Sequence, residues 1–240
     1  MEQLANKLTQ WIKEQVLEAK KTGALVGLSG GIDSAVVAVL CKRAFPDTTL
    51  AAIMPCHSNK MDVVHAYKVS MKFRIRTELI ELEPVYDSLL KIFPQDENCH
   101  AHDKLAQANI KPRLRMISLY YLAAQLDYLV AGTGNRSEIA IGYYTKYGDG
   151  GVDILPLGNL VKRQVKELAA YLEIPREIIN KPPSAGLWEG QTDEGEMGLT
   201  YNELDRYLTT GEANAIVKTK IETMAAVSAH KRAMPQIPPF

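Results

Sequence analysis

The stretch Leu28-Ser29-Gly30-Gly31-Ile32-Asp33-Ser34 decides the fold of this chain, because it joins two apolar segments of different kinds. The short run before it, Ala24-Leu25-Val26, is typical of a buried strand, and residues 35–40 after it continue as a buried helix. Two glycines, two hydroxyl groups and one carboxylate therefore separate a strand from a helix. Glycines let backbone N–H groups approach a ligand, since no Cβ atom stands in the way. The stretch predicts a ligand-binding turn between the first strand and its helix.

The expected ligand of this turn is a phosphate group. The first N–H groups of a helix have no partner inside the helix, and with a glycine-rich turn they form an anion site. The helix macrodipole contributes only about 0.3–1 kcal/mol, so hydrogen bonds and added cations must supply most of the affinity. Two common phosphate loops are excluded: GxxxxGK[ST] needs a lysine that this stretch lacks, and GxGxxG needs another glycine spacing.

Asp33 places a carboxylate inside the predicted anion site, where it would repel a phosphate. A divalent cation between the two would remove the conflict, and Mg²⁺ normally combines one or two carboxylates with phosphate oxygens. The alternative is that Asp33 only complements the helix dipole while the glycines form a tight turn. The combination of residues favours the metal.

Short apolar runs alternate with longer helical patterns along the chain. We expect strands at 24–28, 50–54, 77–82 and 128–131 with a weaker one at 152–155, and helices at 34–44, 61–72, 112–127 and 160–172. This alternation predicts an α/β fold, a doubly wound parallel sheet with right-handed crossovers and helices on both faces.

A second loop, Gly132-Thr133-Gly134-Asn135-Arg136-Ser137-Glu138, repeats the first theme after the fourth strand. In a sheet of order 3-2-1-4-5, strands one and four are neighbours at the point where the order reverses, and ligands bind there beyond the carboxyl ends of the strands. Both loops would then face one crevice, and Asp33 and Glu138 could share a metal ion.

The composition limits the functions that remain. The 240 residues are 46% hydrophobic with zero formal net charge, which argues for one globular domain over 1–240 and against a general nucleic-acid partner. Three cysteines without a CxxC pair predict no disulfide framework and a reducing, cytoplasmic setting. The motif Cys99-His100-Ala101-His102 lacks a fourth metal ligand nearby. An apolar run of about 18 residues is missing, so we expect no membrane span.

The segment 181–198 differs from the rest, with two prolines, four glycines and four acidic residues. We expect it to hold no regular core element and to form a mobile lid. Thr200 and Glu203 have the spacing of a capping box, so a short helix should follow. A C-terminal helix is expected at 213–228, followed by a tail.

These stretches resemble a known family. SGGIDS (29–34) resembles the pyrophosphate-loop motif of the ATP pyrophosphatases, whose fold is of the adenine nucleotide α-hydrolase type. GTGNRSE (132–138), YYTKYGDGGVDILPLGNLVKRQVKELA (143–169) and KPPSAGLWEGQTDEGEMG (181–198) are similar to the ammonia-dependent NAD⁺ synthetases. The resemblance covers roughly residues 4–231.

The resemblance implies a homodimeric, Mg²⁺-dependent ligase. In this family the nicotinate carboxylate of deamido-NAD⁺ attacks the α-phosphate of ATP and releases pyrophosphate; ammonia then attacks the adenylated carboxyl group and releases AMP. Asp33 and Glu138 would hold Mg²⁺. The residues that would contact ATP are Gly27, Leu28, Ser29, Gly30, Gly31, Ile32, Asp33, Ser34, Thr133, Lys162 and Ser184.

The resemblance also implies which residues meet the other substrates. Those that would contact deamido-NAD⁺ are Arg113, Lys146, Asp153, His230 and Lys231, and Arg113 and Arg115 are close enough in sequence to be confused. Asp149 looks like the acid near the incoming ammonia; a carboxylate could bind NH₄⁺ and accept its proton. From chemistry alone, Asp149 could equally form a turn, and Lys162 could be a solvated lysine at a helix start.

Two rival functions use the same residues. A tRNA-modifying ligase with the same loop needs a basic RNA surface, which the net charge opposes. A non-catalytic ATP sensor would not need two metal-binding carboxylates and several lysines.

Overall fold

The computed structural model describes residues 1–93, 100–188 and 190–240, and the backbone alone for 100–103. Its centre is a parallel sheet of β1 (Gly23–Gly27), β2 (Thr49–Ile53), β3 (Arg76–Leu79) and β4 (Tyr128–Ala131), in the order β3-β2-β1-β4. Val26 is paired with Ala51 on one side and with Ala131 on the other. Since β1 and β4 end at the same edge, the loops that follow them open side by side, as the sequence predicted.

The prediction of a fifth strand at 152–155 was wrong: among the described residues the sheet has four strands. The segment makes only an isolated bridge between Ala131 and Ile154. The Val130 N–H donates to Oδ2 of Asp153 at 2.8 Å, so a side chain takes a donor that a neighbouring strand would use. Pro156, which has no N–H, then prevents the ladder from continuing.

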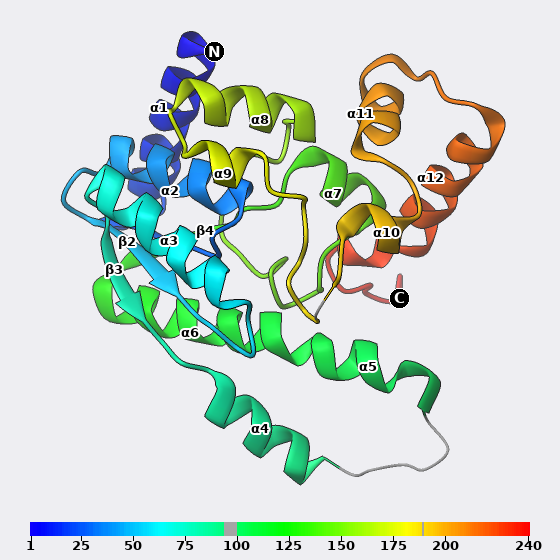
Figure 1. Ribbon diagram of the computed structural model, residues 1–240, viewed down its shortest axis with the longest axis horizontal. Helices are drawn as coiled ribbons and strands as arrows, with labels where there is room; N and C mark the ends of the chain where they lie inside the picture. Colours follow the sequence, from blue (N-terminus) through cyan, green and yellow to red (C-terminus); the bar gives the residue numbers. More distant parts are fainter. Residues whose placement is uncertain (94–99, 189) are drawn as a thin grey trace.

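One face of the sheet is covered by α1 (Glu2–Glu18), α2 (Ile32–Ala44), α3 (Lys60–Phe73), α8 (Lys162–Tyr171) and α9 (Arg176–Ile179) (Figure 1). Ala24 and Val26 of β1 point into this cluster, whereas Leu25 points to the opposite face. This alternation follows from the two-residue period of a strand. The run 35–40 is buried throughout because α2 lies between the sheet, α1 and α8.

The opposite face of the sheet is covered by α6 (Ile110–Leu126) and α4 (Glu83–Ile92), and α5 (His100–Ala108) precedes α6 in the chain. The sequence patterns had predicted α6 but neither α4 nor α5. Cys99 of the Cys-His-Ala-His motif lies outside the described residues, as do the side chains of His100 and His102.

A third hydrophobic cluster lies beside the sheet rather than on it. It is formed by α7 (Arg136–Ile141), α10 (Asp193–Met197), α11 (Tyr201–Thr210) and α12 (Ala215–Val227), and the short η1 (Ala229–Lys231) follows (Figure 1). The expectation that 181–198 holds no regular core element was wrong for α10, because Met197 is 2% exposed within this cluster. The capping box of Thr200 and Glu203 is present at the start of α11, as predicted.

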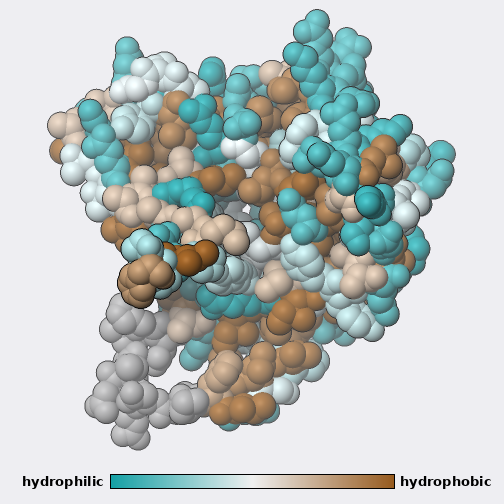
Figure 2. All heavy atoms as spheres, turned by 180° about the vertical axis from the view of Figure 1, so that it is seen from behind, coloured by the Kyte–Doolittle hydropathy of each residue, from teal (hydrophilic) through white to brown (hydrophobic). Residues whose placement is uncertain are grey.

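Seen from behind, hydrophilic and hydrophobic residues mix over most of the surface, which is hollowed near its centre (Figure 2). Within the part of the chain that the structure describes, no helix is long and apolar enough to cross a membrane.

Candidate active site

A pocket of about 460 Å³ opens at the edge of the sheet where β1 and β4 end. The glycine-rich loop forms one wall, and the loop after β4 and the start of α8 form another. Residues from the segment 181–198 complete the lining. The lining residues that the sequence had singled out are Gly27, Leu28, Ser29, Gly31, Ile32, Asp33, Ser34, Thr133, Glu138, Asp149, Lys162, Ser184 and Lys231.

The glycine-rich loop is held in shape by its own hydroxyl groups. Ser34 Oγ donates to the Gly31 carbonyl at 3.0 Å and accepts from the Ser29 N–H at 3.2 Å. Gly30 has φ +78°, and a Cβ there would lie 2.2 Å from the carbonyl oxygen of Asp62 in α3. A side chain at position 30 is therefore excluded twice, by conformation and by space. Gly31, the N-cap of α2, has no side chain that could cap the helix, so the first N–H groups of α2 are available to a ligand.

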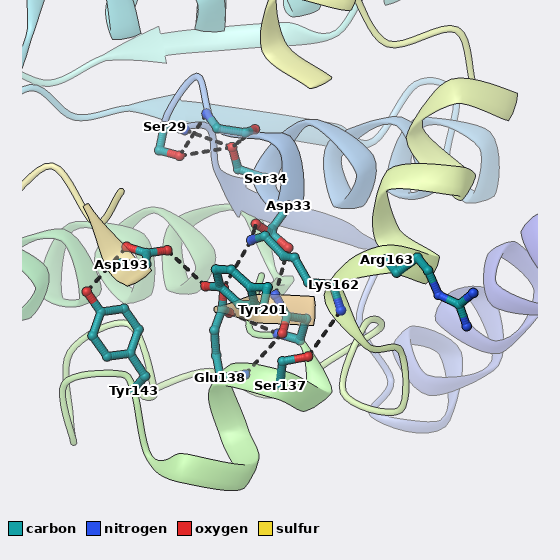
Figure 3. A network of polar contacts seen from close by, with 12 residues as sticks. Ser29, Asp33, Ser34, Ser137, Glu138, Tyr143, Lys162, Arg163, Asp193 and Tyr201 are labelled. Carbon is teal, nitrogen blue, oxygen red and sulfur yellow. Dashed lines mark hydrogen bonds and ion pairs between the residues drawn. The ribbon is translucent and has the colours of Figure 1, made fainter. Parts of the chain in front are cut away.

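Asp33 and Glu138 converge on the ammonium group of Lys162 (Figure 3). Lys162 Nζ lies 2.5 Å from Asp33 Oδ2 and 3.2 Å from Glu138 Oε1, and its side chain is 3% exposed. Burial alone would lower the pKa of Lys162, but the two carboxylates outweigh it and raise the pKa above its usual value. Burial raises the pKa of Glu138, and the charge of Lys162 opposes that shift. The lysine is therefore charged, and it stabilises two carboxylates in a poorly hydrated site.

Asn135 fixes the orientation of both carboxylates. Its Nδ2 donates to Asp33 Oδ1 at 3.0 Å, and its backbone N–H donates to Glu138 Oε2 at 3.1 Å. Its Oδ1 accepts from the Glu138 N–H, which completes a capping box at the start of α7. Asn135 is fully buried, so its position is fixed by the fold. It therefore also fixes which oxygens face Lys162, namely Asp33 Oδ2 and Glu138 Oε1.

The backbone of Lys162 is anchored by Asp205 of α11. The Asp205 carboxylate accepts from Ser137 Oγ at 2.6 Å, from the Lys162 N–H at 3.3 Å and from the Arg163 N–H at 2.7 Å. Val161, at the N-cap position of α8, offers no capping side chain. Asp205 therefore caps α8 from another helix, and it ties the lysine to the third hydrophobic cluster.

Two tyrosines bind the segment 181–198, and one of them, Tyr201, also reaches Glu138 (Figure 3). The Tyr201 hydroxyl lies 2.9 Å from Asp193 Oδ2 and 3.3 Å from Glu138 Oε1, and its ring lies 5.0 Å from Lys162 Nζ. The Tyr143 hydroxyl donates to Glu196 at 2.8 Å and contacts Asp193 at 3.3 Å. Burial raises the pKa of Asp193, and the hydrogen bond from Tyr201 partly opposes it.

The first part of the segment 181–198 contacts further elements around the pocket. Lys181 forms an ion pair with Asp62, beside the glycine-rich loop. Lys111 Nζ donates to the Leu187 carbonyl at 2.8 Å, and Lys104 lies 4.6 Å from the ring centre of Trp188. These contacts tie the segment to α3, α5 and α6.

Asp149 lies in the pocket wall near two cations. The Thr145 N–H donates to its Oδ1 at 2.8 Å, and Arg115 and Lys231 are the nearby positive groups. Desolvation by the surrounding protein raises the pKa of Asp149, and the hydrogen bond from the Thr145 N–H and the charges of Arg115 and Lys231 oppose this shift. The arrangement gives a carboxylate that solvent and a small cation can reach.

Four of the predicted substrate residues do not line the pocket. Arg113 is exposed on α6, whereas Arg115 lines the pocket and donates to the Met54 carbonyl at 3.1 Å and to Ser58 Oγ at 3.2 Å. The structure thus separates two arginines that the sequence left close together. The others outside the pocket lining are Lys146, which donates to the His230 carbonyl at 2.7 Å, Asp153 and His230.

The sequence patterns did not single out the residues that hold the site together. Asn135 carried a usable signal, because Asn-x-x-Glu after a strand is a capping-box pattern. Asp205 and Tyr201 carried none, since they act across more than 40 residues of sequence on α8 and α7.

The chemistry of the donor set fits a divalent cation. Two carboxylate oxygens converge on one point beside a loop that presents backbone N–H groups to an anion, and Mg²⁺ favours carboxylate together with phosphate oxygens. Asp33 and Glu138 are the residues that would hold it.

Comparisons with known proteins agree on one family. The family model of NAD synthase matches residues 4–235. A protein from Carboxydothermus hydrogenoformans named NH(3)-dependent NAD(+) synthetase is 52% identical over 237 residues, which are 99% of this chain and 97% of the relative. Among solved structures, NMN synthetase from Francisella tularensis has a TM-score of 0.93 at 39% identity, covering 100% of this chain and 98% of that chain. NH3-dependent NAD synthetase from Campylobacter jejuni has a TM-score of 0.80 at 30% identity, covering 99% and 98%.

Proposed function

Because this chain belongs to the NAD synthase family, we propose that its pocket makes NAD⁺ from deamido-NAD⁺, ATP and ammonia. The chain is accordingly a carbon–nitrogen ligase. The observation that carries the proposal is the position of Lys162, Asp33 and Glu138 beside the glycine-rich loop, where the triphosphate of ATP would lie.

The proposed reaction has two steps. The nicotinate carboxylate attacks the α-phosphorus of ATP, and the bond to the leaving pyrophosphate breaks. Ammonia then attacks the adenylated carboxyl carbon and AMP leaves. Negative charge gathers on the leaving pyrophosphate, so cations placed there stabilise the transition state more than the ground state. Phosphoryl and nucleotidyl transfer depend mostly on positioning and charge.

The residues of the chain divide this work between them. The N–H groups at the start of α2 bind phosphate oxygens, and the Lys162 ammonium stabilises charge on the leaving group. Asp33 and Glu138 would hold Mg²⁺, which would neutralise charge on the phosphates. Asp149 receives ammonia as NH₄⁺ and accepts its proton, since ammonia attacks only as NH₃. The contacts of Lys111 and Lys181 hold the segment 181–198 in place as a lid. The lid excludes water from the reactive adenylate.

A second copy of the chain would complete the substrate site. Arg113, Ile117 and Tyr121 follow one another at four-residue spacing on α6, and Ile117 and Tyr121 are 59% and 64% exposed. This stripe supports a homodimer in which α6 packs on its equivalent, so that the two Arg113 residues approach the two substrate sites in the same way. The molar mass in solution, measured by light scattering, tests this part: a monomer at micromolar concentration would contradict it.

The function is tested by following NAD⁺ and AMP with ATP, Mg²⁺ and deamido-NAD⁺ while the nitrogen donor is ammonium or glutamine. NAD⁺ with ammonium alone supports the proposal. AMP and pyrophosphate without NAD⁺, on addition of another acceptor, would keep the nucleotide site and discard the substrate.

A second candidate substrate follows from the TM-score of 0.93 with an NMN synthetase, against 0.80 with the NAD synthetase from Campylobacter jejuni. The same chemistry on nicotinate mononucleotide would give nicotinamide mononucleotide. The two candidates differ only in the adenylate half of the substrate, which lies far from the bond that forms. Measuring kcat/KM for both acids under identical conditions decides between them, and a ratio above ten in favour of nicotinate mononucleotide would reverse the preferred assignment.

A further inference from the structure

The ammonium group of Lys162 lies at the point where the two carboxylates of the proposed metal site meet. Asp33 Oδ2 and Glu138 Oε1 both contact Nζ, and the two carboxylate side chains are only 17% and 16% exposed. A lysine that is 3% exposed pairs with both of them at once.

The carboxylates cannot easily turn other oxygens to a metal. Asp33 Oδ1 accepts from Asn135 Nδ2, and Glu138 Oε2 accepts from the Asn135 N–H, so the outer oxygen of each carboxylate is engaged by the same residue. The two inner oxygens are the pair that converges. A divalent cation bound by these oxygens would occupy the space of the Lys162 ammonium, and two cations cannot share it because of both volume and charge.

The backbone of Lys162 stays fixed while its side chain can move. The Lys162 N–H is held by Ser137 and Asp205, whereas the four-carbon stem allows the ammonium to swing about that anchor. The neighbouring pocket wall is the glycine-rich loop. A phosphate bound there would offer the displaced ammonium new anionic partners.

We propose that Lys162 and the divalent cation occupy the Asp33–Glu138 pair in turn, so that the cation enters only when nucleotide phosphate draws the lysine away. This inference rests on the proposed function for the nucleotide. Without phosphate, displacing Lys162 would leave a buried ammonium unpaired, which is strongly unfavourable. The protein alone therefore binds divalent cations weakly, and the nucleotide and the metal bind cooperatively.

Mn²⁺ alone is the probe, because its free concentration is read directly from its electron paramagnetic resonance signal. The wild-type chain without nucleotide is titrated beside K162M, which keeps an unbranched apolar stem and removes the ammonium group with its charge. The control is K220M, the same change at a lysine that donates to the Gly198 carbonyl at 2.8 Å and contacts neither carboxylate. Circular dichroism shows which variants are folded, and K162Q replaces K162M if the latter is not.

K162M is expected to bind one Mn²⁺ at least about tenfold more tightly than the wild-type chain, since the site no longer has to release an internal cation. K220M should match the wild type, and adding E138Q to K162M should remove the gain. Equal weak binding by wild type and K162M would overturn the proposal. Tight binding of one Mn²⁺ by the wild-type chain would overturn it as well, and that titration needs no variant.

The titration contains no substrate, so it separates this inference from the proposed function. An exchange seen with Mn²⁺ but no NAD⁺ formed in the activity assay would remove the substrate assignment and leave the exchange in place. If NAD⁺ forms in the activity assay but wild type and K162M bind Mn²⁺ equally well, the substrate assignment stands and the exchange is discarded.

Discussion

Asn135→Ser separates the two roles of a buried residue, as helix cap and as the link between two carboxylates. Serine is about as good an N-cap as asparagine, so the cap of α7 should change by only a few tenths of a kcal/mol. The serine side chain is too short to replace the 3.0 Å bond from Asn135 Nδ2 to Asp33 Oδ1. A hydrogen bond to a charged group contributes about 1.5–3 kcal/mol, and water can replace part of it because Asp33 is 17% exposed.

We therefore expect Asn135→Ser to lower the free energy of unfolding by about 1–2 kcal/mol. For a chain of this length that is a fall in Tm of roughly 2–4 °C per kcal/mol. Loss of a residue that orients metal ligands typically costs 10- to 100-fold in metal affinity or activity, so the KM for ATP at limiting Mg²⁺ should rise by about tenfold or more.

The matched control is Asn214→Ser, the same change at the N-cap of α12, where Asn214 Oδ1 accepts from the Val217 N–H at 2.9 Å. Thermal melts followed by circular dichroism and initial rates at varied Mg²⁺ give both readouts. If the two serine variants have the same Tm and the same dependence on Mg²⁺, Asn135 is only a helix cap and the reasoning is refuted.

Three further outcomes are expected. Asp33→Ala should abolish Mg²⁺-dependent pyrophosphate release, and normal turnover in this variant would remove Asp33 from the metal site. Lys162→Ala should lower kcat by about 10²–10³, as for loss of one charge-stabilising donor, whereas a loss below about threefold would place the lysine outside the reaction. In Asp193→Asn the stability deficit relative to wild type should shrink as the pH rises. Burial raises the folded-state pKa of Asp193, so the wild type loses stability as the pH climbs above the usual aspartate pKa of about 4, while the amide does not titrate. Melting curves from pH 4.5 to 7.5 check this, and a deficit that grows with pH would contradict it.

The sequence predicted those parts of the fold that depend on local patterns. The four strands and the helices α2, α3, α6 and α8 were predicted to within a few residues, because apolar periodicity and glycine-rich turns mark them directly. The segment 152–155 failed for a reason that no pattern reveals: the Asp153 carboxylate takes the Val130 N–H that a fifth strand would have used. The short α10 was missed because its glycines and acidic residues resemble a loop, yet Met197 anchors it in the third cluster.

The predicted site follows the same division. Asp33 and Glu138 could be placed together because each follows a strand that ends at the same edge of the sheet. The position of Lys162 between them could not be derived, since it depends on how α8 packs and on a carboxylate from α11. Arg113 and Arg115 differ by two positions on one helix, so they point to different sides, and the packing of α6 decides which faces the pocket.

The cap that Asp205 places on α8 has a consequence for synthesis of the chain. A ribosome-bound chain that has emerged to about residue 190 contains every strand of the described sheet, the glycine-rich loop, both carboxylates and Lys162. It still lacks Asp205, so the Lys162 and Arg163 N–H groups have no carboxylate to hold them, and it lacks Tyr201 beside Glu138. The last fifth of the polypeptide therefore supplies the second anchor of the Lys162 backbone beside Ser137, and a product truncated near residue 190 should hold this lysine less firmly.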